Sequence, residues 1–321
     1  GNSSSENKTK IYTMYGESVS EALRLLTTKS GNVPLFAHNR VVVVNENLKE
    51  KSLNDITDFF VRNYDSRVSQ LMCVAKDKTA EEIIRAQLFQ DTVKSEILEN
   101  LLEESYLQSI VPRVRIIDVV NSLQNPLTVL CIPAVTVIKN ENNEDYKLVG
   151  CALYNQKGKV VSYLDTEQTK GIAFLNDTVK NGFLTVSISQ GEKATFLINK
   201  SKTRYNIKTV NGNLVYKINV KISCDIDEIS DVSNFSTDEK ILDEMKNAVR
   251  TSVSERIYGA LNVLQKQNEG DCVSFCKILE LKNNKLYNQV KDDWDSVFSA
   301  IQTEIVVDVT IRRVGEETLK K

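Results

Sequence analysis

Apolar residues recur every three or four positions in several segments of the chain, a spacing that predicts amphipathic helices. The first such helix follows Ser18-Val-Ser-Glu21, where serine and glutamate have capping-box spacing, and it ends at Gly31. The longest follows a second capping-box sequence, Ser236-Thr-Asp-Glu239, continues to Leu264 and stops before Gly270. Shorter stretches of the same kind predict helices at residues 53–62, 79–85, 91–105, 165–175, 271–281 and 292–301.

Runs of β-branched or alternating apolar residues between these helices predict strands. Three short ones alternate with helices in a βαβαβ-like order, at residues 11–15, 40–44 and 68–75. Residues 127–139 predict a strand that Pro133 disturbs, followed by a polar turn and a hairpin partner at 146–154. Residues 113–123 fit either a strand or a short buried helix, and their pattern does not choose between the two.

The strand pattern is clearer in the second half of the chain. Short strands are predicted at residues 149–155, 159–164, 183–189 and 194–199. Asn211-Gly212 is a strong turn signal, because a two-residue type I′ turn needs positive φ at both positions. Apolar side chains then alternate with mainly polar ones from Leu214 to Ile226, and again over residues 303–313. Antiparallel strands, a helical block and one returning strand together predict an α+β domain.

The length of 321 residues is too great for one ordinary hydrophobic core, so two or three domains are expected. The opening, residues 1–8, is polar and low in complexity, so it predicts no part of the fold. The longest apolar run, residues 127–138, contains Pro133 and is shorter than the roughly 20 residues that a membrane-spanning helix needs. No spanning helix is therefore predicted.

Charge is balanced along the chain, with 41 basic and 43 acidic residues and a formal net charge of −2. Such a balance provides no long-range attraction to phosphate backbones or to anionic lipid. Binding to nucleic acid is therefore not expected.

The six cysteines give little support to a metal site. They stand at 73, 131, 151, 224, 272 and 276, without a CxxC pair, and the chain has a single histidine, His38. Zinc sites need clustered thiolates or imidazoles at short spacing. Cys272 and Cys276, one helical turn apart, would suit paired ligands, but the pattern favours two small apolar residues on one helix face. All six are expected to be reduced and mostly buried.

Catalytic motifs are also missing from the sequence, which has no phosphate-binding GxxxxGK[ST] loop, no GxGxxG, no HExxH and no GxSxG. His38 stands at a strand entrance without an obvious orienting carboxylate, which favours a structural hydrogen bond. Ser274-Phe-Cys-Lys277 matches the S-x-x-K pattern of penicillin-interacting enzymes, but their KTG and SDN elements are absent. We expect a chance match there.

An acidic group and a tryptophan carry side chains that could form binding sites. An acidic group follows the long strand and has the oxygen ligands that a hard cation prefers: Asp225, Asp227, Glu228 and Asp231. It lacks the spacing and the glycine of a calcium loop, so a solvated strand end is favoured. Trp294 lies at helical spacing among apolar neighbours, which favours core packing over ligand stacking. No catalytic, cofactor-binding or metal site is predicted.

Several short motifs occur in an order that resembles the Ger(x)C family, the C subunits of spore germinant receptors. The N-terminal ones are residues 16–22, Phe36-Ala-His-Asn39 and Phe60-Val-Arg62, and the central ones are residues 148–165 and 169–175. The tail carries Leu261-Asn-Val-Leu-Gln-Lys266, Asp271, Trp294 and Ile311-Arg-Arg-Val-Gly315. The resemblance runs from Ile11 to Gly315. Ser162 departs from it, since the family often has glycine there.

The resemblance implies an α+β fold with three mixed α/β domains in an extended arrangement, made of largely antiparallel sheets with packed helices. The expected domains are residues 1–84, 85–147 and 148–321. The family begins with a signal peptide, a lipid-modified cysteine that carries palmitate, and additional strands. None of these is found here, so the first domain is expected to be truncated at its start.

The resemblance also implies a function in germination. The protein is expected to be a non-catalytic lipoprotein at the outer face of the spore's inner membrane, beside a membrane-embedded A subunit and often a B subunit. No cofactor and no catalytic residues come with the family. Two alternatives stay open: a ligand-binding lipoprotein with a small-molecule pocket between domains, and an enzyme, which would need a desolvated carboxylate pair.

Overall fold

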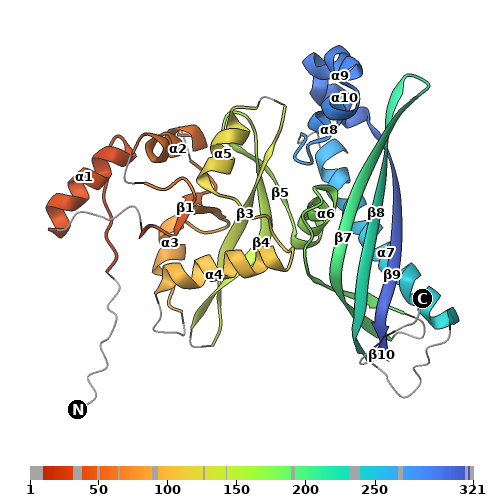
Figure 1. Ribbon diagram of the computed structural model, residues 1–321. Coiled ribbons are helices and arrows are strands. Elements are labelled where there is room, and N and C mark those ends of the chain that lie inside the picture. The colour runs from red at the N-terminus through yellow and green to blue at the C-terminus, as the bar shows by residue number, and fades with distance from the viewer. Residues whose placement is uncertain are drawn as a thin grey trace. The chain divides into compact units, whose positions relative to one another are not determined.

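The computed structural model separates into two compact units (Figure 1). Unit 1 comprises Gly1–Glu103 and Arg113–Tyr163, and unit 2 comprises Glu104–Pro112 and Leu164–Lys321. The structure describes residues 10–31, 38–48, 51–63, 66–88, 93–125, 127–141, 143–188, 192–230, 239–266, 270–314 and 317–318.

Unit 1 contains a five-stranded sheet of order β1-β2-β3-β4-β5. Its strands are β1 (Val41–Asn45), β2 (Leu71–Ala75), β3 (Leu130–Lys139), β4 (Glu144–Tyr154) and β5 (Val160–Leu164). β1 and β3 both pair with β2 in parallel, whereas β3 and β4 form the predicted antiparallel hairpin. The register of that hairpin shifts between Pro133 and Val135, as expected for a residue that has no N–H to donate.

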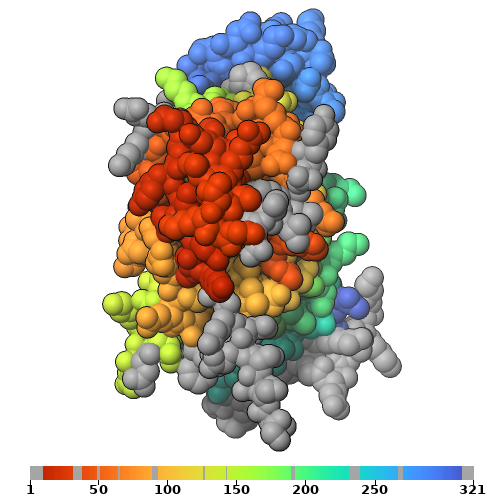
Figure 2. All heavy atoms as spheres, turned by 90° about the vertical axis from the view of Figure 1, so that its left-hand side faces the viewer, coloured from red at the N-terminus to blue at the C-terminus, as the bar shows by residue number. Residues whose placement is uncertain are grey.

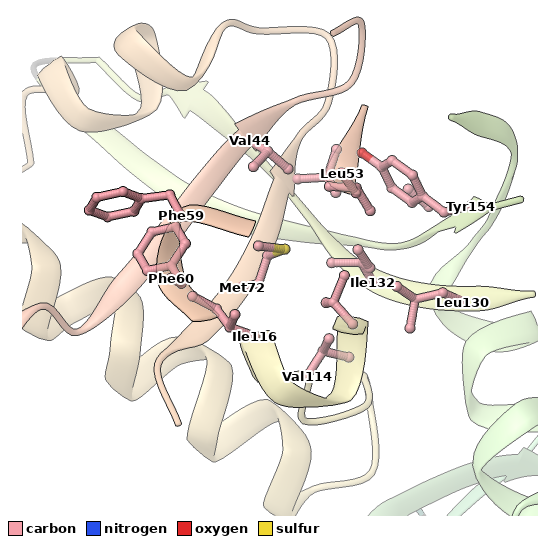
Figure 3. Close-up of a cluster of buried hydrophobic side chains, with 13 residues drawn as sticks. Val44, Leu53, Phe59, Phe60, Met72, Val114, Ile116, Leu130, Ile132 and Tyr154 are labelled. Atoms are coloured by element: carbon pink, nitrogen blue, oxygen red, sulfur yellow. The ribbon is translucent and has the colours of Figure 1, made fainter. Parts of the chain in front are cut away.

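The helices of unit 1 are α1 (Val19–Ser30), α2 (Leu53–Arg62), α3 (Ala80–Arg85), α4 (Lys94–Leu107), whose last four residues belong to unit 2, and α5 (Ile116–Leu123). Every residue of β2 is buried, and the apolar side chains of α2 and α5 meet it in one cluster (Figure 3). α1 lies at the surface of unit 1, and none of its residues is buried (Figure 2).

The local signals place most of these helices correctly. The Ser18 hydroxyl accepts from the Glu21 N–H at 3.2 Å, and Thr79 does the same for Glu82 at 3.1 Å. The Glu21 carboxylate accepts from the Glu17 N–H and not from Ser18, so the predicted box is only half formed. Residues 113–123, which fitted two alternatives, contain helix α5. The strand predicted at 11–15 is wrong, because that segment pairs with no strand.

Unit 2 contains a second five-stranded sheet of order β10-β9-β8-β7-β6. Its strands are β6 (Phe183–Ser187), β7 (Lys193–Val210), β8 (Asn213–Ile229), β9 (Gln302–Val314) and β10 (Glu317–Thr318). Neighbouring strands are antiparallel except β8 and β9. The turn between β7 and β8 has φ of 50° at Asn211 and 82° at Gly212, which confirms the predicted hairpin. β7 is much longer than the predicted strand at residues 194–199.

The helices of unit 2 are α6 (Thr166–Leu175), α7 (Glu239–Leu261), α8 (Phe275–Lys282), α9 (Asn284–Val290) and α10 (Trp294–Ala300). α7 runs along one face of the sheet and continues into a π-helical turn, Asn262–Lys266 (Figure 1). α6 approaches α7 closely at Gly171, where an added Cβ would lie 2.2 Å from the Arg256 carbonyl oxygen. The predicted cap at Ser236–Glu239 lies mostly outside the described residues.

The predicted fold class is confirmed: the protein is a mixed α/β structure with two sheets, dominated by antiparallel pairs, and packed helices. The two sheets also contain the parallel pairs β1–β2, β2–β3 and β8–β9. The division into three domains, at 1–84, 85–147 and 148–321, stays a prediction. Contacts group residues 85–103 and 113–147 with the first unit.

Candidate functional site

The candidate residues of the sequence do not converge on one site in the part of the chain that the structure describes. His38 is exposed and immediately precedes the segment that leads into β1, and its structural hydrogen bond stays a prediction. Ser274 is the N-cap of α8, with a left-handed backbone (φ 58°), while Lys277 is exposed. The acidic residues of β8 divide: Asp225 is half-buried, Asp227 and Glu228 are exposed, and Asp231 lies outside the described residues.

The cysteines are free, as predicted, and all but the half-buried Cys131 are buried. Cys276 is in α8, but Cys272 precedes that helix, so the expectation that they share one helix face is wrong. Burial, together with the charges of Asp271 and Glu280, raises the pKa of Cys276 to about 12. No group of three or more metal-ligating side chains occurs among the residues that the structure describes.

Asp271 is the centre of a buried hydrogen-bond network in unit 2. Its carboxylate accepts N–H bonds from Val273 at 3.1 Å, Phe275 at 3.0 Å and Cys276 at 2.8 Å, so it takes the place of a capping side chain for α8. It also accepts from Trp294 Nε1 at 3.3 Å. Burial raises the pKa of Asp271 to about 6, although these four donors act in the opposite direction.

The same network explains the tail motif of the sequence. Gln265 lies in the π-helical turn after α7 and donates to the carbonyl oxygens of Phe298 at 2.9 Å and Ile301 at 3.0 Å. Gln265 thus holds the C-terminal end of α10, while Asp271 holds Trp294 at its N-terminal end. Trp294 is 2% exposed, which confirms core packing. Gln265 and Asp271 of this motif therefore stabilise the packing of α8 and α10 in unit 2.

Aromatic side chains extend this network toward the sheet. Phe275 stacks on Tyr216 of β8 with ring centroids 4.6 Å apart and meets Tyr205 of β7 edge-on at 5.7 Å. Both phenols donate to backbone carbonyls: Tyr216 to Phe275 at 2.9 Å and Tyr205 to Leu175 at 2.5 Å. Burial raises the pKa of both phenols. Their protons are therefore held in structural bonds.

Unit 1 contains a partly open hollow of about 530 Å³ beside α4 and the hairpin of β3 and β4. Its lining combines three apolar side chains, a tyrosine, two amides and a carboxylate: Leu88, Ile97, Leu101, Tyr146, Asn140, Asn143 and Asp145. The apolar side chains of α4 differ in their exposure beside this hollow. Leu98 and Leu102 are buried, whereas Ile97 and Leu101, which line the hollow, are only half-buried.

Hydrogen bonds to backbone groups connect the segments that surround this hollow. The Gln87 N–H donates to Glu144 Oε2 at 2.8 Å, and the Glu144 N–H donates to the Gln87 carbonyl at 2.9 Å. Tyr146 donates to the Ile83 carbonyl at 3.0 Å, and burial raises its pKa to about 12. A lining that combines apolar side chains with amides is suited to contact with another molecule.

The sequence did not identify this hollow as a site. The stripe of α4 and the polar turn at residues 140–145 were both visible, but they are far apart along the chain. The pairing of Gln87 with Glu144 brings them together, and no local pattern predicts that contact.

No helix among the described residues combines the length and the apolar character needed to cross a lipid bilayer.

Comparison with known proteins places the chain in a family. The family described as "Spore germination B3/ GerAC like, C-terminal" matches residues 149–315, and "Spore germination protein N-terminal domain" matches residues 1–137. Spore germination protein KC of Bacillus subtilis (strain 168) is 24% identical, covering 95% of this chain and 79% of that protein. Spore germination protein B3 of the same organism is 23% identical, covering 96% and 81%.

A solved structure has the same fold. The crystal structure of the GerBC protein superposes with a TM-score of 0.70 at 21% identity, covering 91% of this chain and 84% of that one. The two family matches include both units and the tail residues Gln265, Asp271 and Trp294. The chain therefore belongs to the Spore germination B3/GerAC-like family, the Ger(x)C proteins.

Proposed function

We propose that this protein is a non-catalytic lipoprotein subunit of a spore nutrient germinant receptor, required for germination and acting through contacts with other proteins. The observation that carries the proposal is the pair of family matches, which together cover residues 1–137 and 149–315. The relatives that match along the chain are spore germination proteins by name.

The chemistry of the described residues supports a role without catalysis. The buried carboxylate of Asp271 accepts from three backbone N–H groups and one indole, and the buried phenols of Tyr205 and Tyr216 donate to carbonyls. A catalytic acid or base has to reach a substrate. Groups whose hydrogen bonds are all made within the folded chain stabilise the fold.

The proposed partners are the membrane-embedded A subunit and, in receptors that have one, the B subunit. A lipid anchor at the outer face of the spore's inner membrane would confine the protein to the surface where those subunits lie. Such a tether raises the effective concentration of each weak contact. Modest contact surfaces on this protein would then be sufficient for assembly.

Co-purification of the lipidated full-length protein with its A subunit, followed by crosslink mapping, tests this function. We expect the two to co-purify and spores without this protein to lose their nutrient response. Spores that respond normally without it, or purified protein that turns over a small molecule, would contradict the proposal.

The hollow of unit 1 favours a second candidate function, the binding of a small molecule. Its volume of about 530 Å³ and its mixture of apolar and amide groups resemble ordinary ligand sites. This hollow lies within one unit, whereas the sequence suggested a pocket between domains.

Calorimetry with single amino acids and sugars distinguishes the two functions. Micromolar binding that Ile97→Asp removes, and that Ile84→Asp leaves unchanged, would favour the small-molecule site. Ile84 is a matched control, because it is 46% exposed on α3 and does not line the hollow. We expect no binding by either variant or by the parent protein.

A further inference from the structure

The outward face of the long strands in unit 2 collects basic side chains. The opposite face of β8 is apolar and buried along Ile218, Val220 and Ile222. On β7, the outward positions carry Lys200, Lys202 and Arg204, each of them exposed. Side chains alternate between the two faces of a strand, so these three lie in one row about 7 Å apart.

Strand pairing brings a fourth cation beside that row. Lys202 is directly opposite Lys221 of β8, and Arg204 is opposite Asn219. Like charges at directly opposite positions of an antiparallel pair lower stability. This arrangement is thus unfavourable for the isolated sheet and favourable for binding an anion.

The acidic residues nearby only partly neutralise these cations. Lys202 forms an ion pair with Asp177, and Lys221 approaches Asp308 of β9 at 4.0 Å, with 72% and 60% of the two side chains exposed. The Lys221–Asp308 pair, exposed to this degree, contributes little. Among the described residues, neither Lys200 nor Arg204 forms an ion pair with a carboxylate.

The basic row lines a hollow of about 570 Å³. Four cations and a single carboxylate, that of Asp308, face into it, together with the polar side chains of Asn219, Ser223 and Thr310. A recessed site admits a narrow segment more readily than a planar lipid surface. The row of cations along β7 also repeats with the two-residue period of an extended chain.

We propose that this face of β7, β8 and β9 binds an extended acidic segment of a partner protein, with Asp or Glu at alternate positions aligned on Lys200, Lys202 and Arg204. The inference rests on the proposed function, since it gives the chemistry of one partner contact. Binding measured on the purified chain alone separates its failure from failure of the germination role.

Fluorescence anisotropy with a labelled peptide carrying glutamate at alternate positions tests the proposal. We expect binding that weakens as salt is raised to about 0.15 M and above. The double variant Lys200→Gln with Arg204→Gln should weaken binding about tenfold. The pair Lys200→Arg with Arg204→Lys keeps both charges and should retain it. A peptide with glutamine in place of glutamate should not bind.

The matched control is the double variant Lys246→Gln with Arg250→Gln on α7, which removes the same charge from the same unit. Equal weakening by both double variants would show unspecific charge attraction and overturn the proposal. So would absence of peptide binding by the parent chain when circular dichroism shows it to be folded. Binding to phosphatidylglycerol vesicles, lost in the Lys200 and Arg204 variant while the peptide does not bind, would replace the protein partner with a membrane.

Discussion

At the scale of single residues, the informative positions are those where one side chain satisfies several groups. Asp271 accepts from three backbone N–H groups and from Trp294, in a site that is almost fully buried. A buried carboxylate without a cationic partner favours its neutral form, and burial raises its pKa to about 6. Asp271 therefore couples the packing of α8 and α10 to pH.

The first prediction concerns this coupling. In the unfolded chain Asp271 titrates near its ordinary value of 3.8, below its folded value of about 6. The folded state binds the proton more tightly, so the stabilisation is complete below pH 4 and is lost as pH rises through 6. We expect this group to lower the free energy of unfolding by up to about 3 kcal/mol across that window.

Urea unfolding of the parent protein and of Asp271→Asn between pH 4 and pH 7 measures the effect. The asparagine does not titrate, so the stability difference between the two proteins should change across the window in favour of the variant as pH rises. A difference that stays constant with pH would show that Asp271 does not have a raised pKa.

At the scale of elements, close approach between helices decides which substitutions are tolerated. Gly171 of α6 faces the backbone of α7, where an added Cβ would lie 2.2 Å from the Arg256 carbonyl oxygen. A Cβ added at Gly259 of α7 would have only one neighbouring atom within 4 Å, Gln168 Cγ at 3.8 Å. The two glycines therefore have different roles in the same helix pair.

The second prediction uses this contrast. Gly171→Ala should destabilise the protein by about 2 kcal/mol, because backbone cannot move aside without separating α6 from α7. Gly259→Ala should be neutral or stabilising by up to about 1 kcal/mol, because alanine is the better helix former. Thermal unfolding of the two variants measures both effects. Equal changes in the two variants would contradict the close approach.

At the scale of the whole molecule, the cysteines are divided evenly between the two units. Three cysteines belong to each: Cys73, Cys131 and Cys151 to unit 1, and Cys224, Cys272 and Cys276 to unit 2. Burial raises the pKa of Cys73, Cys224 and Cys276 to about 12, so the reactive thiolate is scarce while the protein is folded.

The third prediction is that thiol labelling reports the unfolding of each unit. In the native protein only Cys131, which is half-buried, should react at an appreciable rate. As the denaturant concentration rises, the three cysteines of one unit should become reactive together. The three cysteines of the other unit should become reactive at a different denaturant concentration. Pulsed alkylation followed by mass spectrometry measures this. A single transition shared by all six would show that the units unfold as one.

Local elements could be predicted from the sequence because their signals are short-range. The helix predicted at residues 53–62 is α2, Leu53–Arg62, and Asn211-Gly212 forms the turn that its composition required. Residues 113–123 stayed ambiguous, since a short apolar run suits a buried helix as well as a strand. The strand predicted at 11–15 failed because strand formation depends on a partner elsewhere in the chain.

The sequence by itself determined the family, through the order of its motifs, and the α+β class, through periodicity in the second half of the chain and through the family resemblance elsewhere. The tertiary structure alone decided which distant residues meet: Gln265 with the end of α10, Asp271 with Trp294, and Lys202 with Lys221. Periodicity is a property of neighbours along the chain, whereas these contacts follow from strand register and helix packing. For the same reason, the net charge of −2 did not predict the basic face of β7 and β8, which forms only when strand pairing brings Lys221 beside Lys202.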